Sequence, residues 1–131
     1  MGLLLDTNIL IALQLKQKNI VDAVDNLTAI HIEPPAISFI NYFEFYYGLF
    51  DKSIKSRTTQ TAFIKKFNCL KATDITAEIL AELKYKYEKQ GVVIPLADVI
   101  IASHAKEYNL VLVTHDKAFE KIEEIKKVII D

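Results

Sequence analysis

Four acidic residues have the chemistry and the positions to form a reactive centre. Asp6 directly follows an apolar run at residues 2–5, and Asp116 comes shortly after a second run at residues 110–113. Glu44 lies within an apolar, aromatic segment, and Asp98 lies near the start of another. Carboxylates at such positions serve either as helix caps or as ligands of hard cations.

Capping is the simplest explanation for Asp6 and Asp116. Each precedes a segment with helical periodicity, and an Asp side chain accepts hydrogen bonds from the free N–H groups at the start of a helix. Asp74, which precedes Ile75-Thr76-Ala77-Glu78, is expected to be a cap with no further role. Considered one at a time, these acids do not establish a site.

Glu44 cannot be a cap, because it lies in the middle of the helix expected at residues 39–50. It shares a helical face with Ile40, Phe43 and Tyr47, and this spacing is typical of a face that packs inward. A carboxylate on an inward face is costly unless it has a partner. A tyrosine hydroxyl of the same helix is one candidate partner, and a metal ion or its hydration shell is the other.

Asp98 lies in the first turn of the helix expected at residues 96–108. A contact with the helix dipole, worth about 0.3–1 kcal/mol, would explain its presence there. However, Asp98 shares a face with Ile101, Ala102 and Ala105. Because the alanines are small, this helix can approach the sheet closely and bring Asp98 near the strand ends.

Acids at two strand ends and on two inward helix faces would repel one another, since no comparable set of Lys or Arg accompanies them. A hard divalent cation relieves such repulsion, and all-oxygen ligation favours Mg²⁺ or Mn²⁺ over Zn²⁺. The three histidines are scattered and are expected to be surface or partly buried polar groups: His31, His104 and His115. We therefore expect a metal site formed by Asp6, Glu44, Asp98 and Asp116.

The elements that must position these acids alternate between short apolar runs and helical patterns. The sequence predicts strands at residues 2–5, 32–38, 69–72, 110–113 and 127–130, and helices at residues 7–15, 20–27, 39–50, 58–67, 76–89, 96–108 and 116–123. This alternation predicts βαβ units and therefore a parallel sheet covered by helices on both faces. Such sheets bind ligands beyond the carboxyl ends of their strands, where Asp6 and Asp116 are expected.

Size and composition indicate a single α/β domain spanning residues 1–131. The chain is 51% hydrophobic and 25% charged, with no visible repeat or linker. A lone cysteine, Cys69, cannot form an internal disulfide, which favours a reducing, cytoplasmic location. The apolar N-terminus lacks a basic region and is interrupted by Asp6 and Asn8, so we expect neither a signal peptide nor a membrane span.

The net charge of −1 does not by itself indicate a nucleic-acid partner. Residues 52–71 nevertheless carry only basic charges, namely Lys52, Lys55, Arg57, Lys65, Lys66 and Lys71. The segment is either a solvated helix face with a loop or a surface that contacts phosphates. Charge alone leaves both alternatives open.

At four places the sequence resembles the PIN-domain nucleases, and in particular the VapC-like toxins of toxin–antitoxin pairs. The segments are Leu4-Leu5-Asp6-Thr7-Asn8-Ile9, then Ser38 with Glu44 and Gly48, then residues 98–105, and finally Val113-Thr114-His115-Asp116 through Phe119. They occur in the order of the family and span nearly the whole chain, so the set is far more specific than any single motif. The departures are Asn41, where a Thr is common, and Ser103, where a small apolar residue is common.

The resemblance implies a three-layer α/β/α sandwich whose parallel five-stranded sheet has the order 3-2-1-4-5. It also implies an endoribonuclease that depends on Mg²⁺ or Mn²⁺ and hydrolyses RNA phosphodiester bonds, with the four acids named above as metal ligands. Asn8 and Thr114 match positions that orient the acids or contact water on the metal. The implied protein partner is a cognate antitoxin, whose Arg or Lys side chains would enter the acidic cleft.

Two other functions remain open on the sequence. A non-catalytic module that binds RNA or a partner would keep the fold without cutting, although all four acids are present. A Mg²⁺-dependent phosphotransfer or receiver-like domain also gathers acids at strand ends. A phosphatase of that kind would need an Asp at the position of Asn8, and no phosphoacceptor Asp ends a middle strand.

The helix around Tyr42, Phe45, Tyr46 and Phe50 has more aromatic surface than one core face needs. Apolar surface in excess of the core is typical of an interface. We therefore expect a homodimer or higher homo-oligomer, or an apolar groove for the partner, on that side of the molecule.

Overall fold

A computed structural model describes residues 2–131 of the chain. Its strands are β1 (Leu3–Leu5), β2 (Ala36–Ser38), β3 (Asn68–Leu70), β4 (Val111–Thr114) and β5 (Lys126–Ile129). Its α-helices are α1 (Thr7–Gln14), α2 (Lys18–Ile30), α3 (Phe39–Tyr47), α4 (Ile54–Ile64), α5 (Asp74–Lys89) and α6 (Leu96–Glu107), and a 3₁₀ helix, η1 (Lys117–Lys121), follows β4. Within residues 2–131, no helix has the length and apolar character that crossing a membrane requires.

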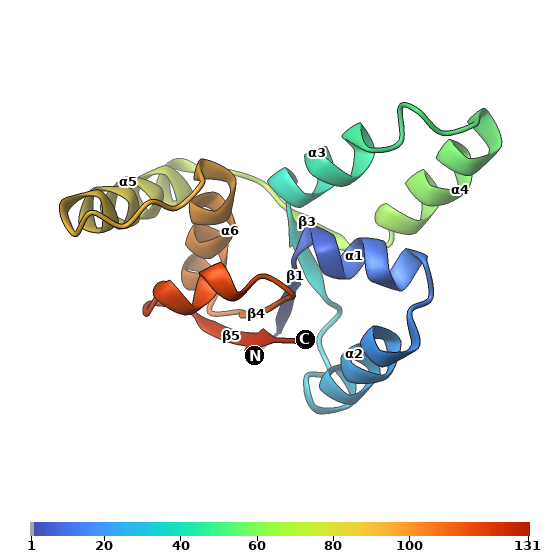
Figure 1. The fold of residues 1–131 in the computed structure, drawn as a ribbon, viewed down its shortest axis with the longest axis horizontal. Helices are drawn as coiled ribbons and strands as arrows, with labels where there is room; N and C mark the ends of the chain where they lie inside the picture. The colour runs from blue at the N-terminus through green and yellow to red at the C-terminus, as the bar shows by residue number, and fades with distance from the viewer. Residues whose placement is uncertain (1) are drawn as a thin grey trace.

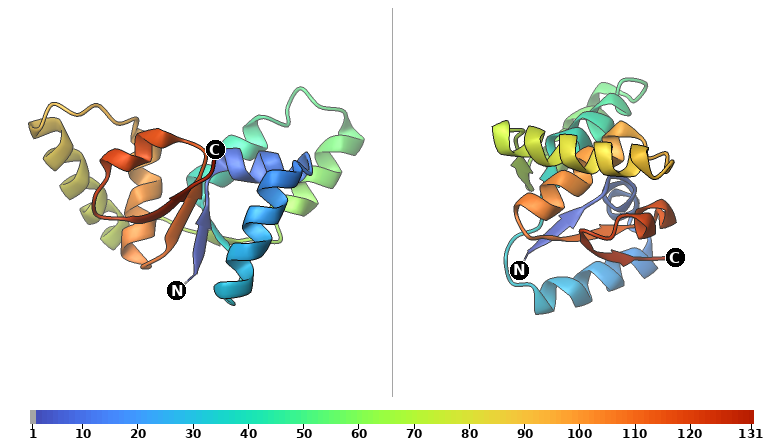
Figure 2. Two further views of the ribbon diagram at one scale, coloured as in Figure 1. Left: turned by 60° about the horizontal axis from the view of Figure 1, so that its bottom comes forward. Right: turned by 90° about the vertical axis from the view of Figure 1, so that its left-hand side faces the viewer.

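The strands form one parallel sheet in the order β3-β2-β1-β4-β5. This order confirms the predicted α/β fold and its topology. The N-terminal strand β1 lies in the centre and pairs with β4, with Leu3 opposite Val111 and Leu5 opposite Val113. The chain therefore turns to opposite sides of β1 in its two halves, as the two arms of the ribbon in Figures 1 and 2 show.

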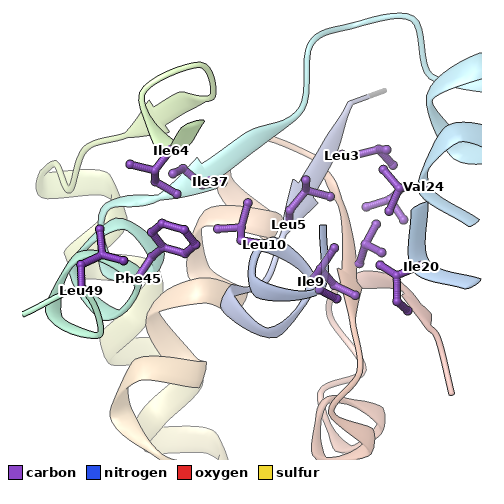
Figure 3. Packing of buried hydrophobic residues seen from close by; sticks show 13 residues of the cluster. Leu3, Leu5, Ile9, Leu10, Ile20, Val24, Ile37, Phe45, Leu49 and Ile64 are labelled. Atoms are coloured by element: carbon purple, nitrogen blue, oxygen red, sulfur yellow. The ribbon is translucent and has the colours of Figure 1, made fainter. Parts of the chain in front are cut away.

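Alternation along β1 divides the core into two layers. Leu3 and Leu5 point to one face, where they pack with residues of α1 and α2 such as Ile9 and Ile20 (Figure 3). Leu4 points to the other face and packs with residues of α5, α6 and η1. Because side chains of a strand alternate between faces, one run of three leucines holds both helical layers to the sheet.

Several element boundaries differ from the predicted ones. Helix α4 begins at Ile54 rather than at residue 58, because the Ser53 side chain accepts a hydrogen bond from Ser56 N–H and caps the helix. Strand β2 is shorter than predicted, since Pro34 and Pro35 have no N–H group to offer a neighbouring strand. The segment predicted as a helix at residues 116–123 is the short 3₁₀ helix η1.

Asp74 is not the cap of α5, as the sequence had suggested. Thr73 is the cap: its hydroxyl accepts a hydrogen bond from Thr76 N–H, and the Thr76 hydroxyl accepts one from Thr73 N–H in return. Asp74 is instead the first residue of the helix and is exposed. A Thr at the third helical position thus closes a reciprocal capping box in this chain.

Candidate active site

The predicted site residues all lie at the edge of the sheet where the strands end. Asp6 directly follows β1, and Asp116 follows Thr114, the last residue of β4. Glu44 is carried by α3, which starts where β2 ends, and Asp98 is in the first turn of α6. In parallel α/β sheets, this edge is the one at which ligands bind.

Asp6 is buried, with 6% of its surface exposed, and it is surrounded by hydrogen-bond donors. Its Oδ2 accepts from the Thr114 hydroxyl at 2.6 Å and from Asn8 Nδ2 at 3.4 Å. Its Oδ1 accepts from Thr7 N–H at 2.8 Å, which caps α1. Burial raises the pKa of Asp6, and the hydrogen bond from Thr114 opposes that rise. Capping and participation in a site are therefore compatible at this residue.

Asn8 and Thr114, the predicted supporting residues, join Asp6 to Asp116. The Thr114 hydroxyl accepts from Asp116 N–H at 2.9 Å while it donates to Asp6. Asn8 accepts from His115 N–H at 3.1 Å, which connects α1 to the segment after β4. Asp116 itself caps η1 through a 2.8 Å bond from Ala118 N–H.

The prediction that Glu44 lies on an inward face is wrong, and so is the suggested tyrosine partner. The buried face of α3 is formed by Asn41 and Phe45, whereas Phe43, Glu44 and Tyr47 are exposed. Counting apolar residues misplaced the face because α3 is apolar nearly all round. The partner of Glu44 is the hydroxyl of Thr7, which donates to Oε1 at 2.7 Å.

Asp98 is the acid with the largest electrostatic perturbation. It is partly buried above Ile101, Ala102 and Ala105, which are all buried as predicted. Among residues 2–131, no side chain or N–H group donates a hydrogen bond to its carboxylate. Burial first, and then the charges of Asp6, Asp116 and Glu44, raise its pKa from 3.8 to about 6.

These electrostatic contributions show that the four acids surround one space. No basic side chain contributes to the pKa of Asp6 or of Asp98. As they stand in residues 2–131, the acid, His and Cys side chains do not form a ready-made metal centre, because Asp6, Glu44 and Asp116 each accept from a neighbouring hydroxyl or N–H group. The donor set nevertheless fits a hard divalent cation, since every side chain facing the space offers carboxylate oxygens.

Asn41 and Thr7 are residues of the site that the sequence analysis did not assign. Asn41 is fully buried, and its Nδ2 donates to Thr7 Oγ1 at 3.1 Å and to Asp6 Oδ1 at 3.4 Å. One signal was available in the sequence: Asn41 is a polar residue on the same helical face as Phe45 and Leu49. A polar side chain on a buried face needs a partner, and here that partner is the site.

His104 was expected to be a surface or partly buried group, but it is fully buried. Its Nδ1 lies 2.9 Å from the Ser38 hydroxyl, and its Nε2 lies 3.2 Å from the Lys71 carbonyl oxygen. Burial lowers the pKa of His104, and the hydrogen bond to the carbonyl opposes this effect. The residue ties α6 to the ends of β2 and β3 and lies outside the acid cluster.

The aromatic surface lies on other residues than those predicted. Phe45 belongs to the core with 4% exposure, and Tyr42 and Tyr46 are partly buried against it. The exposed aromatic side chains of this region are Phe43, Tyr47 and Phe50. Beside them, a groove of about 300 Å³ runs between α1, α3 and α4, and its lining includes Ile11, Leu15, Glu44, Leu49 and Lys52.

Comparison with known proteins agrees with this geometry. The family model of the PIN domain matches residues 3–125. The fold is similar to that of chains in three solved structures: VapBC2 from Rickettsia felis bound to a DNA fragment from their promoter (26% identity, 100% of both chains covered, TM-score 0.87), VapBC-1 from nontypeable Haemophilus influenzae (28% identity, 98% of each chain covered, TM-score 0.82), and a toxin–antitoxin complex from Klebsiella pneumoniae (27% identity, 97% of this chain and 96% of the other covered, TM-score 0.77). No curated protein matches the sequence. Since the family model matches nearly the whole chain and the sheet has the expected order, the chain belongs to the PIN domain family.

Proposed function

We propose that this protein is a Mg²⁺- or Mn²⁺-dependent endoribonuclease and the toxin of a toxin–antitoxin pair. One observation carries the proposal: Asp6, Glu44, Asp98 and Asp116 come from separate parts of the chain and perturb one another across a common space. Evenly negative clusters of this kind, with no basic side chain among them, are typical of cation sites. Membership of the PIN domain family supports a nuclease.

In this proposal, Asp6, Asp98 and Asp116 hold the cation, and Glu44 binds it directly or through water. A divalent cation held there supplies positive charge to the scissile phosphate and makes a water molecule more acidic. Asn8 and Thr114 keep the carboxylate of Asp6 turned towards the site through their hydrogen bonds. Asp98 has no donor of its own in residues 2–131, so its oxygens are available for ligation.

An antitoxin is the proposed protein partner, because the similar structures from Rickettsia felis and Klebsiella pneumoniae are complexes of such pairs. The groove beside Glu44 offers apolar side chains, Ile11, Leu15 and Leu49, next to the acidic centre. A helix that lays apolar residues in the groove and presents an Arg or Lys to the carboxylates would match both features.

Cleavage of mixed RNAs by the purified protein tests the proposed activity. We expect cleavage with Mg²⁺ or Mn²⁺, none in excess EDTA, and a loss of orders of magnitude in the Asp98→Asn variant. The Asp74→Asn variant is the matched control, since Asp74 is exposed and away from the cluster, and it should cut as well as the wild type. Full activity in EDTA or in folded Asp98→Asn protein would contradict the assignment. RNA binding without any cleavage would favour a non-catalytic module instead.

A further inference from the structure

The side chain of Asn41 uses both ends of its amide group inside the fold. Its Oδ1 accepts from Ser38 N–H at 2.9 Å, which completes the capping box of α3. Its Nδ2 donates to Thr7 Oγ1 at 3.1 Å and to Asp6 Oδ1 at 3.4 Å. A flipped amide would place its NH₂ group against the N–H of Ser38, so the donors must point to Thr7 and Asp6.

The hydroxyl of Thr7 passes this orientation on to Glu44. A threonine hydroxyl has one proton, and because Thr7 Oγ1 accepts from Asn41, its proton is directed to Glu44 Oε1 at 2.7 Å. Glu44 lies on the exposed face of α3, and within residues 2–131 this hydroxyl is its hydrogen-bond donor. The chain of donors therefore runs in one direction, from Asn41 through Thr7 to the carboxylate of Glu44.

We propose that Asn41 is a positioning residue of the candidate active site, which fixes Asp6 directly and Glu44 through Thr7. Asp6 follows a strand and Glu44 lies on a helix, so a shared donor is what sets these two acids relative to each other. This inference rests on the function proposed above, because it assigns Asn41 a role in the same cation site. Asn41 itself is fully buried and contacts neither the cation nor the RNA.

The capping role of Asn41 can be separated from its positioning role with a substitution that the chain itself suggests. In α5, a Thr at the equivalent helical position closes the capping box through Thr73 N–H and Thr76 Oγ1 at 3.0 Å. Asn41→Thr should therefore keep the cap of α3. A threonine has a single hydroxyl proton, which cannot serve both Asp6 and Thr7.

Isothermal titration of the full-length protein with Mn²⁺ measures the consequence. We expect Asn41→Thr to bind Mn²⁺ about tenfold more weakly or worse, the loss typical of groups that orient metal ligands. In RNA cleavage, we expect kcat to fall while KM for RNA stays the same, because Asn41 does not reach the substrate. Thr7→Val removes the intermediate hydroxyl, so the double variant should lose less affinity than the product of the two single losses.

Tyr87→Phe is the control for a general loss of stability. The Tyr87 hydroxyl donates to Glu124 and accepts from Glu123 N–H, far from the acids, so this variant should melt lower but bind Mn²⁺ normally. Wild-type affinity in Asn41→Thr, or an equal loss of affinity in Tyr87→Phe, would overturn the positioning role alone. A wild-type protein that neither binds Mn²⁺ nor cuts RNA would overturn the proposed function together with this inference.

Discussion

At Asp98, burial and three neighbouring acids make the charged carboxylate unfavourable, and its pKa rises to about 6. A carboxyl group whose pKa is raised in the folded state favours folding while it is protonated. This contribution is fully present below pH 3.8, the pKa of the unfolded state, and is lost as the pH rises through about 6. The cation-free protein therefore carries the full penalty at neutral pH.

Removing this charge should stabilise the protein when no metal is present. Full burial would make the pKa change worth about 3 kcal/mol, and because Asp98 is only partly buried, screening by solvent leaves about 1 kcal/mol. We expect Asp98→Asn to melt roughly 3 °C above the wild type at pH 7 in EDTA, with the gap closing near pH 4. Thermal melts across this pH range measure it, and an unchanged gap at all pH values would contradict the coupling.

The same variant should lose the stabilisation that Mg²⁺ gives to the wild type. Only the folded state assembles the four acids, so a bound cation raises the melting temperature in proportion to its concentration and affinity. Asp74→Asn, outside the cluster, should keep this response. Equal responses to Mg²⁺ in the wild type, Asp98→Asn and Asp74→Asn would mean that these acids do not form one site.

His104 should produce a pH dependence of the opposite sign. Its pKa is lowered by burial, so the neutral ring stabilises the fold above the unfolded-state pKa of 6.5. This stability is lost as the pH falls below 6.5 towards the folded-state pKa, because the unfolded chain binds the proton first. We expect His104→Gln to lose less stability than the wild type between pH 7 and pH 5. Parallel melting curves of the two proteins would contradict this prediction.

At the scale of elements, α4 and its flanking segments present basic side chains with no carboxylate partner. Within residues 2–131, no ion pair involves Lys52, Arg57 or Lys65, and the Arg57 guanidinium instead lies 5.1 Å from the centre of the Phe50 ring. Lys52 also borders the groove that contains Glu44. The open question of the basic segment at residues 52–71 can therefore be tested at its two best-placed cations.

If these cations contact RNA, Lys52→Ala and Arg57→Ala should each raise KM and leave kcat nearly unchanged. Each lost phosphate contact should also make the dependence of log affinity on log salt concentration shallower by about 0.7 for a single strand. Filter binding of a non-cleaved RNA at several salt concentrations measures both effects. Lys84→Ala, on α5, is the control, since Lys84 pairs with Glu88. A salt dependence that does not change in either variant would leave the segment as a solvated face.

The arrangement of elements was predictable from the sequence to a greater extent than the directions of side chains. Alternation of apolar runs was enough for the parallel sheet, and the ordered motifs implied its strand order. The face of α3 was not predictable, because apolar periodicity carries little information in a segment as uniformly apolar as residues 39–50. Likewise, the tertiary contacts of His104 with Ser38 and Lys71 join residues that are far apart in the sequence, and no local pattern encodes them.

For the whole molecule, the exposed aromatic face of α3 predicts self-association. Phe43 is 58% exposed, Tyr47 66% and Phe50 56%, and their rings lie near one another. Adjacent exposed aromatic rings are typical of an interface rather than of a free surface. We expect a homodimer by light scattering, and a Phe43→Ser/Tyr47→Ser variant should shift it towards monomer. A wild-type protein that remains monomeric at high concentration would contradict this prediction.

The pairing of β1 with β4 also determines when the site comes into existence. Asp6 receives its shortest hydrogen bond from Thr114, a residue 108 positions later in the chain. Contacts of such long sequence separation form late in folding, because a large loop must close first. During synthesis the ribosome makes Asp6 early, but β4 and Asp116 only after most of the chain. A polypeptide released before residue 111 would lack the strand that completes the centre of the sheet, so an unfinished copy of this protein should be inert.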